Sequence, residues 1–306
     1  MFFRNLTLFR FSTSVAPSLD DPESALAAHR LRPCGAMEMA THGFVPPLGP
    51  DAEALTHAVG ASLLLTVGSE DKLLPASVVN EELSRKVRKL AEAEGRRVGG
   101  RERKRLKQET LDELLPRAFS RPSRLQVWLQ RKQGWAVFDT SSRKAAEQAL
   151  GSVREALGSF PAVPLTPERS PRQIMTDWLT GGELPAGLAL ADECELRDPV
   201  NAGGAVVRCR HQDLDSDEIR EHLRGGKQVF QLGLSFEERI GFVLGEDLVV
   251  RKLKFFDVVT DDLEHTQADS VAAEMDARFA LMTLELERLL DKLDTWFGLP
   301  RPADGH

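Results

Sequence analysis

The chain has 306 residues, of which 42% are hydrophobic and 28% charged, and its 40 basic and 47 acidic side chains give a formal net charge of −7. This is the composition of a globular protein of one or two domains, and it excludes collagen, a disulfide-rich scaffold and a chain that is disordered throughout. The longest apolar runs, such as residues 61–65, are far shorter than the ~18 residues that a transmembrane helix needs, so we expect no membrane partner.

The first part of the sequence predicts strands and loops of a sheet. Residues 3–11 alternate loosely between apolar and polar side chains and favour a strand over an export signal, because Arg4 and Arg10 interrupt the hydrophobic stretch. Residues 42–50 contain three prolines and two glycines and predict an ordered loop. Residues 61–67 predict the next strand.

The middle of the chain predicts a helical hairpin. The pattern from Ser77 to Leu115 is helical, but Gly95, Gly99 and Gly100 interrupt it, so we expect two helices joined by a basic turn. Few apolar residues lie on these helices. The hairpin should therefore project from the body, with its charges facing solvent or a ligand.

The rest of the chain interleaves strands and helices irregularly, and its last helix, at residues 271–296, has apolar residues at every third or fourth position. This order predicts the α+β class, with mixed sheets and a long C-terminal helix. The expected domains are a discontinuous α+β body (residues 1–76 and 120–168), the hairpin (77–119), and a second α+β region (169–306) whose last helix packs back on the body.

The three cysteines, Cys34, Cys194 and Cys209, are isolated in the sequence, with no Cys-x-x-Cys pair and no histidines at ligand spacing. This pattern argues against a zinc site and a disulfide framework. We therefore expect no metal or other cofactor, and a reducing, cytoplasmic location.

The charges are distributed unevenly along the sequence. The segment from Arg85 to Lys132 contains 16 basic and 6 acidic residues, whereas the remainder contains 24 basic and 41 acidic residues. A chain polarised in this way can bind a polyanion through one face; the alternative is a solvated helical surface. Binding to DNA without sequence readout requires Lys and Arg placed against phosphates. The candidates in this segment are Lys86, Arg97, Arg101, Arg103, Lys104, Lys107, Arg117, Arg121 and Arg124.

Two further features are candidates for binding surfaces. In the strand-like residues 251–255, Lys252 and Lys254 share one face, where they either extend the basic surface or discourage aggregation at a sheet edge. Phe119 follows the helix-ending Pro116 among polar and basic residues. It is either a contact with a partner subunit or a core residue.

Motifs for catalysis are weak. The sequence has no Gly-x-Ser-x-Gly and no phosphate-binding Gly-x4-Gly-Lys-Ser/Thr loop. A metal-dependent nuclease is the alternative function, because clustered carboxylates can hold Mg²⁺ for phosphodiester cleavage. Its candidate residues are Glu246 and Asp247 with Lys252, or Asp257, Asp261 and Asp262.

Several ordered segments, taken together, carry a family pattern. They are Pro33-Cys34-Gly35, residues 43–49 (Gly-Phe-Val-Pro-Pro-Leu-Gly), residues 54–57 (Ala-Leu-Thr-His), residues 114–121 (Leu-Leu-Pro-Arg-Ala-Phe-Ser-Arg), residues 157–165, residues 212–214 (Gln-Asp-Leu), residues 252–255 (Lys-Leu-Lys-Phe) and residues 279–285. In order and spacing, along essentially the whole chain, they resemble the RdgC family of bacterial recombination-associated proteins.

The resemblance implies a horseshoe-like subunit that forms a ring-shaped homodimer with a positively charged hole. It implies binding to double- and single-stranded DNA without sequence preference, restraint of RecA-mediated strand exchange, a nucleoid-associated location in the cytoplasm, and no enzymatic activity. Whether RecA is contacted directly stays open. Phe119 matches the apolar position of the family's motif, and we expect it to plug a dimer interface that opens to admit DNA. The chain departs from the family pattern at Gly95, Gly99 and Gly100, which interrupt a more continuously helical stretch.

Overall fold

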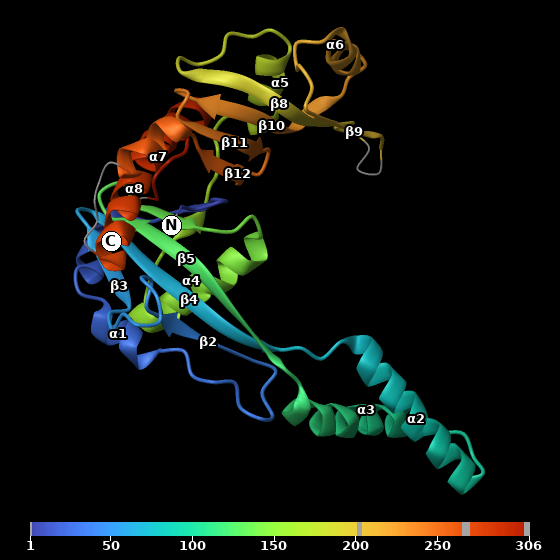
Figure 1. Ribbon diagram of the computed structural model, residues 1–306. Helices are drawn as coiled ribbons and strands as arrows, with labels where there is room; N and C mark the ends of the chain where they lie inside the picture. The colour runs from blue at the N-terminus through green and yellow to red at the C-terminus, as the bar shows by residue number, and fades with distance from the viewer. Residues whose placement is uncertain (1, 201–203, 265–269, 303–306) are drawn as a thin grey trace.

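The computed structural model describes residues 2–200, 204–264 and 270–302. It contains two antiparallel sheets, a helical hairpin and a long C-terminal helix (Figure 1). The α+β class predicted from the sequence is confirmed. None of the helices in these residues is both long and apolar enough to cross a bilayer.

The first sheet has seven strands in the order β2-β4-β5-β6-β1-β7, with β3 also paired to β4. Its longest strands, β4 and β5, have 11 residues each and pair along their whole length, from Ser62 opposite Gln130 to Lys72 opposite Ser120. The strands are β1 (Thr7–Arg10), β2 (Ala40–Val45), β3 (Thr56–Val59), β4 (Ser62–Lys72), β5 (Ser120–Gln130), β6 (Trp135–Phe138) and β7 (Val163–Pro164).

The prediction of a loop over residues 42–50 was wrong at its start, because residues 42–45 belong to β2 and pair with β4. Gly43 contributed to the prediction of a loop, but in the structure it lets the backbone of β2 lie close to the backbone of Leu31. A Cβ atom at position 43 would lie 2.5 Å from the backbone nitrogen of Leu31. Glycine therefore lets the segment around Leu31 pack directly on β2.

Helices cover one face of the first sheet. They are the 3₁₀ helix η1 (Thr13–Leu19), α1 (Glu23–Ala28) and α4 (Arg143–Leu157). Phe9, Val127 and Phe138 of the sheet pack with Leu26 of α1 and Leu150 of α4 in one core. Alternation along the strands places Trp128 and Val137 on the opposite face, in a second and larger core.

The second sheet has five strands in the order β12-β11-β10-β8-β9. They are β8 (Leu188–Arg197), β9 (Val206–Arg210), β10 (Gln228–Phe236), β11 (Ile240–Gly245) and β12 (Val250–Phe255), accompanied by α5 (Pro171–Leu179), α6 (Asp217–Arg224) and α7 (Asp257–Glu264). The C-terminal helix α8 (Val271–Phe297) lies between the two sheets (Figure 1). Its Leu286 shares the larger core with Trp128 of the first sheet and Leu232 of the second.

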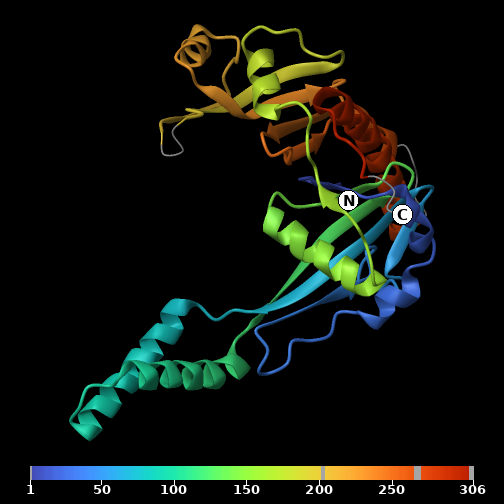
Figure 2. The ribbon, with the colours of Figure 1, turned by 180° about the vertical axis from the view of Figure 1, so that it is seen from behind.

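The hairpin consists of α2 (Ala76–Glu94), α3 (Gly100–Leu114) and the 3₁₀ turn η2 (Leu115–Arg117), as predicted. It continues from the ends of β4 and β5 and projects away from the second sheet (Figures 1 and 2). Its fully buried apolar residues are few, namely Val79, Leu83 and Leu115, and none of the three belongs to either main core. The hairpin is therefore held by a narrow interface of its own.

Candidate nucleic-acid interface

The structure places nine of the eleven predicted DNA-binding cations on one continuous segment, formed by the hairpin and the start of β5. Lys86 lies on α2, Arg97 in the turn, Arg117 in η2, and the other six lie on α3 (Arg101, Arg103, Lys104, Lys107) and β5 (Arg121, Arg124). Lys252 and Lys254 lie on β12 of the second sheet. This sheet and the hairpin lie at opposite ends of the molecule, so the structure does not join the two basic patches (Figure 1).

The positions on α3 explain why the hairpin exposes its cations. Residues three and four apart share a face of a helix, and Leu106 and Thr110, four apart, form the inner face. Thr110 is buried and Leu106 half-buried, whereas Arg103, Lys104 and Lys107 are exposed. The helix thus buries a narrow stripe against α2 and turns its basic residues to solvent.

Ion pairing separates the predicted cations into two groups. Lys86 is mostly buried and binds the Glu113 carboxylate at 2.7 Å, and Lys252 binds Glu193. Among the residues that the structure describes, the others are exposed and have no carboxylate within 4 Å. These nine are Arg97, Arg101, Arg103, Lys104, Lys107, Arg117, Arg121, Arg124 and Lys254. Their charges are available to a ligand.

Arg96 does not join this group, although it lies in the same basic turn. Its guanidinium binds both carboxylate oxygens of Glu102, at 2.8 and 2.9 Å, and also binds Glu94. The hydrogen bonds from Arg96 lower the pKa of Glu102, and those to Glu102 raise the pKa of Arg96. Arg96 therefore closes the hairpin turn, next to the αL conformation of Gly95.

Phe119 lies at the base of the hairpin with 83% of its surface exposed, so the alternative of a core residue is wrong within one chain. An apolar residue lies opposite it on the neighbouring strand. The Leu73 N–H donates to the Phe119 carbonyl at 2.7 Å and continues the pairing of Lys72 with Ser120, so the two side chains lie on one face. Leu73 is 47% exposed. We call Leu73 and Phe119 the stem patch.

The candidate carboxylates of a nuclease are mostly engaged or dispersed. Glu246 lies 3.8 Å from Arg172, and Asp247 binds Arg251 at 2.6 Å. Burial raises the pKa of Asp247, but Arg251 and backbone N–H groups together outweigh burial, and the net shift is downward. The side chains of Asp257 and Asp261 are exposed on α7, and that of Asp262 lies outside the described residues. Within the described ranges, no three His, Cys, Asp or Glu side chains are grouped to hold a metal ion.

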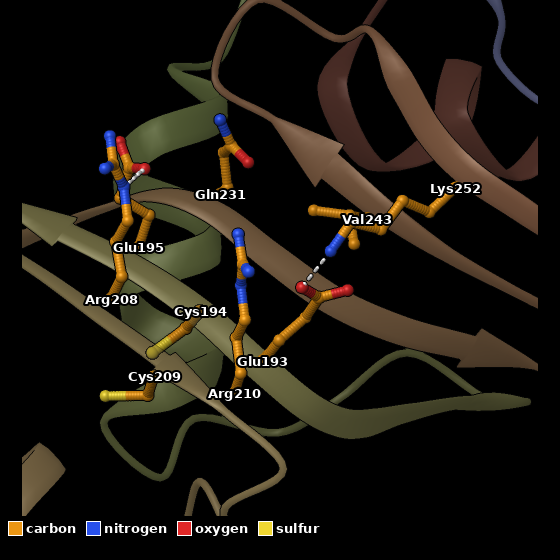
Figure 3. Close-up of a pocket in the computed structure, with 9 residues that line it drawn as sticks. All are labelled: Glu193, Cys194, Glu195, Arg208, Cys209, Arg210, Gln231, Val243 and Lys252. Atoms are coloured by element: carbon orange, nitrogen blue, oxygen red, sulfur yellow. Dashed lines mark hydrogen bonds and ion pairs between the residues drawn. The ribbon is translucent and has the colours of Figure 1, made fainter.

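The structure brings two groups of basic residues into view, each of which joins a predicted cation to arginines that the sequence analysis did not single out. Arg4 and Arg124 line the same cavity of 490 Å³, together with Gln126 and Asp139. On the second sheet, Arg208 and Arg210 lie near Lys252 and line one pocket with it (Figure 3). The alternation of residues 206–210 was the available signal for the second group, whereas the first depends on the contact of the N-terminal segment with β5.

Comparison with known proteins agrees with the family resemblance over nearly the whole chain. A family model described as "Putative exonuclease, RdgC" matches residues 1–299. A protein of Stenotrophomonas maltophilia named recombination-associated protein RdgC is 51% identical over 302 residues, which cover 98% of this chain and 99% of that protein. Proteins with the same name from Xanthomonas campestris pv. campestris and Xanthomonas axonopodis pv. citri are also 51% identical, over 290 and 302 residues. They cover 94% and 98% of this chain, and 95% and 99% of their own lengths. The chain therefore belongs to the RdgC family of recombination-associated proteins.

Proposed function

We propose that this protein binds double- and single-stranded DNA without sequence preference, as a ring-shaped homodimer, and restrains RecA-mediated strand exchange by occupying the DNA. The observation that carries the proposal is the set of nine exposed predicted cations that lie beyond ion-pair distance of every described carboxylate. Membership in a family of recombination-associated proteins supports DNA as the polyanion.

The nine unpaired cations should contribute more to DNA binding than the cations that already form ion pairs within the protein. A lysine or arginine that is bound to a carboxylate must break this pair before it binds phosphate, whereas a solvated cation only displaces water and counterions. The hairpin places most of these free cations on one exposed segment. The acidic remainder of the chain lies elsewhere, so DNA can approach the hairpin without strong repulsion.

The proposal assigns a role to each expected domain. The hairpin (77–119) contacts DNA and the partner subunit, while the body (1–76 and 120–168) and the second region (169–306) form the arms of a horseshoe-like subunit. The two subunits close a ring, and the protein associates with the nucleoid in the cytoplasm. DNA contacts are proposed for all eleven predicted cations, with Lys86 and Lys252 contributing least because they have partners.

Phe119 supports the dimer in this proposal. A phenylalanine that is 83% exposed beside Leu73 leaves apolar surface in water, and its burial by a second copy would be favourable by about 2 kcal/mol for the ring alone. Opening of this interface would admit DNA that lacks free ends. Strand exchange would then be hindered because the closed ring occupies the DNA, without any need to contact RecA.

A second candidate function is favoured by the description of the family model, which names an exonuclease. It would use a divalent metal ion and the late carboxylates Asp257, Asp261 and Asp262, or Glu246 and Asp247. This candidate differs from the first in its need for metal. We propose that the protein binds DNA and does not cleave it.

Binding of a fluorescent duplex of arbitrary sequence, measured across a salt series with and without EDTA, tests the two functions together. The mass of the protein in solution is recorded alongside. A dimer whose binding survives EDTA and weakens steeply with salt supports the proposal. Absence of binding at low salt contradicts DNA binding, and shortening of the labelled duplex only with Mg²⁺ or Mn²⁺ favours the nuclease.

A further inference from the structure

Two cysteines face each other across the β8–β9 pair of the second sheet. Cys194 and Cys209 are direct partners in the register, and a pair of charged residues flanks them on either side. Directly opposed residues of an antiparallel pair have Cα atoms ~4.5 or ~5.5 Å apart, and both spacings lie within the ~4.4–6.8 Å that a disulfide spans. Figure 3 shows the two thiol groups next to each other on neighbouring strands. The strands therefore already hold the two sulfur atoms in reach of a bond.

The two thiols differ in their access to solvent. Cys194 is 4% exposed and belongs to the larger core, whereas Cys209 is half-buried at the margin of that core. Burial, reinforced by the neighbouring Cys209, raises the pKa of Cys194 to about 12. At neutral pH Cys194 is thus a protonated and unreactive thiol, and a reagent in solution meets Cys209 first.

The neighbours of Cys209 on β9 are arginines. Arg208 and Arg210 are exposed, and because side chains alternate along a strand, they lie on the face opposite the Cys209 thiol. Arg208 binds the Glu195 carboxylate at 2.6 Å, while Arg210 has no carboxylate within 4 Å in the described part of the chain.

We propose that Cys194 and Cys209 form a reversible intramolecular disulfide in exchange with a low-molecular-weight disulfide such as oxidised glutathione. The Cys209 thiolate attacks one sulfur of the reagent, forms a mixed disulfide and releases one glutathione thiolate. Cys194 then loses its proton to water and attacks the Sγ atom of Cys209, and the second glutathione leaves. Two protein thiols are oxidised, and one reagent disulfide is reduced to two thiols.

The bond would fix an edge of the molecule. In the described residues β9 pairs with β8 alone, so it is held less firmly than an inner strand. A covalent link between the two strands closes a loop of about 15 residues and restricts the opening of β9. Arg208 and Arg210 would be held in place with it.

The full-length protein, reduced and free of oxygen, is equilibrated with mixtures of oxidised and reduced glutathione, alkylated and analysed by peptide mass. We expect Cys34 to remain alkylated and the peptides with Cys194 and Cys209 to be linked, with reversal by excess reduced glutathione. Amide exchange in β9 should slow at least tenfold in the linked form. Cys34→Ser should behave in the same way, whereas Cys194→Ser should carry only a glutathione adduct at Cys209.

The proposal is independent of DNA binding, so its failure would leave the proposed function untouched. It is overturned if all three thiols are still alkylated at a hundredfold excess of oxidised glutathione. Links between two chains, or a link to Cys34, would overturn it as well, because they would show that the register of β8 and β9 does not select the pair.

Discussion

Among the residues that the structure describes, Arg10 is the most buried charged side chain. Its guanidinium donates to the Asp294 carboxylate at 2.6 Å and to the Gln133 carbonyl at 2.9 Å, and it lies 3.7 Å from the centroid of the Trp135 ring. Burial lowers the pKa of Arg10 and the charge of Asp294 opposes this shift. The pair ties β1, in the first sheet, to the end of α8.

Asp294→Asn should therefore destabilise the protein. The variant leaves a buried guanidinium without its counter-charge, which typically costs ~3 kcal/mol in the free energy of unfolding. Urea unfolding measures this difference. Asp291→Asn, on the same helix and exposed, is the control and should change the free energy by less than ~0.5 kcal/mol. Equal effects of the two variants would show that Asp294 is not the necessary partner of Arg10.

Asp139 predicts how stability depends on pH. Its Oδ1 atom accepts N–H bonds from Arg4 and Asn5, at 2.8 and 3.0 Å, but burial outweighs them and raises its pKa above the ordinary 3.8. The folded protein thus binds more protons than the unfolded chain as pH rises from 3.8 through the raised pKa, and stability falls in this window. Asp139→Asn keeps an oxygen acceptor and removes the charge. Its Tm should exceed that of the wild type at pH 7, with the difference vanishing near pH 3; a lower Tm at pH 7 would contradict this account.

At the level of elements, the hairpin should loosen independently of the body. Leu83 is 3% exposed and contributes to neither main core, so Leu83→Ala removes packing between α2 and α3 only. The opening free energy of the hairpin should fall by ~2 kcal/mol, seen as faster amide exchange there, while the main unfolding transition stays in place. Leu150→Ala, in a main core, is the contrasting variant and should lower that transition. If the hairpin unfolds only together with the body, the hairpin does not open independently.

The elements that the sequence predicted well are those whose apolar residues recur at regular spacing or whose ends are marked by glycine. The apolar residues of α8 recur at helical spacing, and Gly95 ends α2 with a positive φ of 63°. Strand β2 was missed because Gly43 serves a contact with Leu31 that only the tertiary structure shows. The bridge between Leu6 and Val250, which links the sheets, also has no local signal.

Like the fold, the candidate site could be predicted only in part from the sequence. Composition along the chain located the basic segment, because basic and helix-forming residues coincide there. It could not separate Lys86 from its neighbours, since its carboxylate partner Glu113 is fixed by the packing of α2 on α3. The cavity beside Arg124 depends likewise on a segment more than 100 residues away.

For the whole molecule, the uneven charge predicts which cations set the salt dependence of the proposed DNA binding. Arg103→Ala with Lys104→Ala removes two exposed charges of α3, and each lost phosphate contact lowers the slope of log K against log salt by ~0.9. Arg143→Ala with Lys144→Ala is a matched control, because it removes an exposed Arg-Lys pair from α4 of the body. Only the first variant should lower the slope. If both variants lower it equally, net charge and not the hairpin governs binding.

The proposed ring leads to a prediction about the topology of bound DNA. Replacing Phe119 by serine removes the largest exposed apolar group of the stem patch, and a loss of ~2 kcal/mol at a dimer interface raises its dissociation constant about thirtyfold. Leu284→Ser, at an apolar residue that is 57% exposed on α8, is the matched control. Sedimentation of the free proteins should show weaker association for Phe119→Ser alone.

A salt challenge of complexes on closed circular DNA then separates encirclement from simple adhesion. High salt breaks phosphate contacts, but a closed ring cannot leave a circle that has no ends. The wild type and Leu284→Ser should stay on the circles and be released when a nuclease linearises them, whereas Phe119→Ser should be released from both forms. RecA-mediated strand exchange should recover with Phe119→Ser at the same protein concentration. If the wild type leaves circles and linear DNA equally fast, the protein holds DNA by charge alone, and the stem patch does not close a ring.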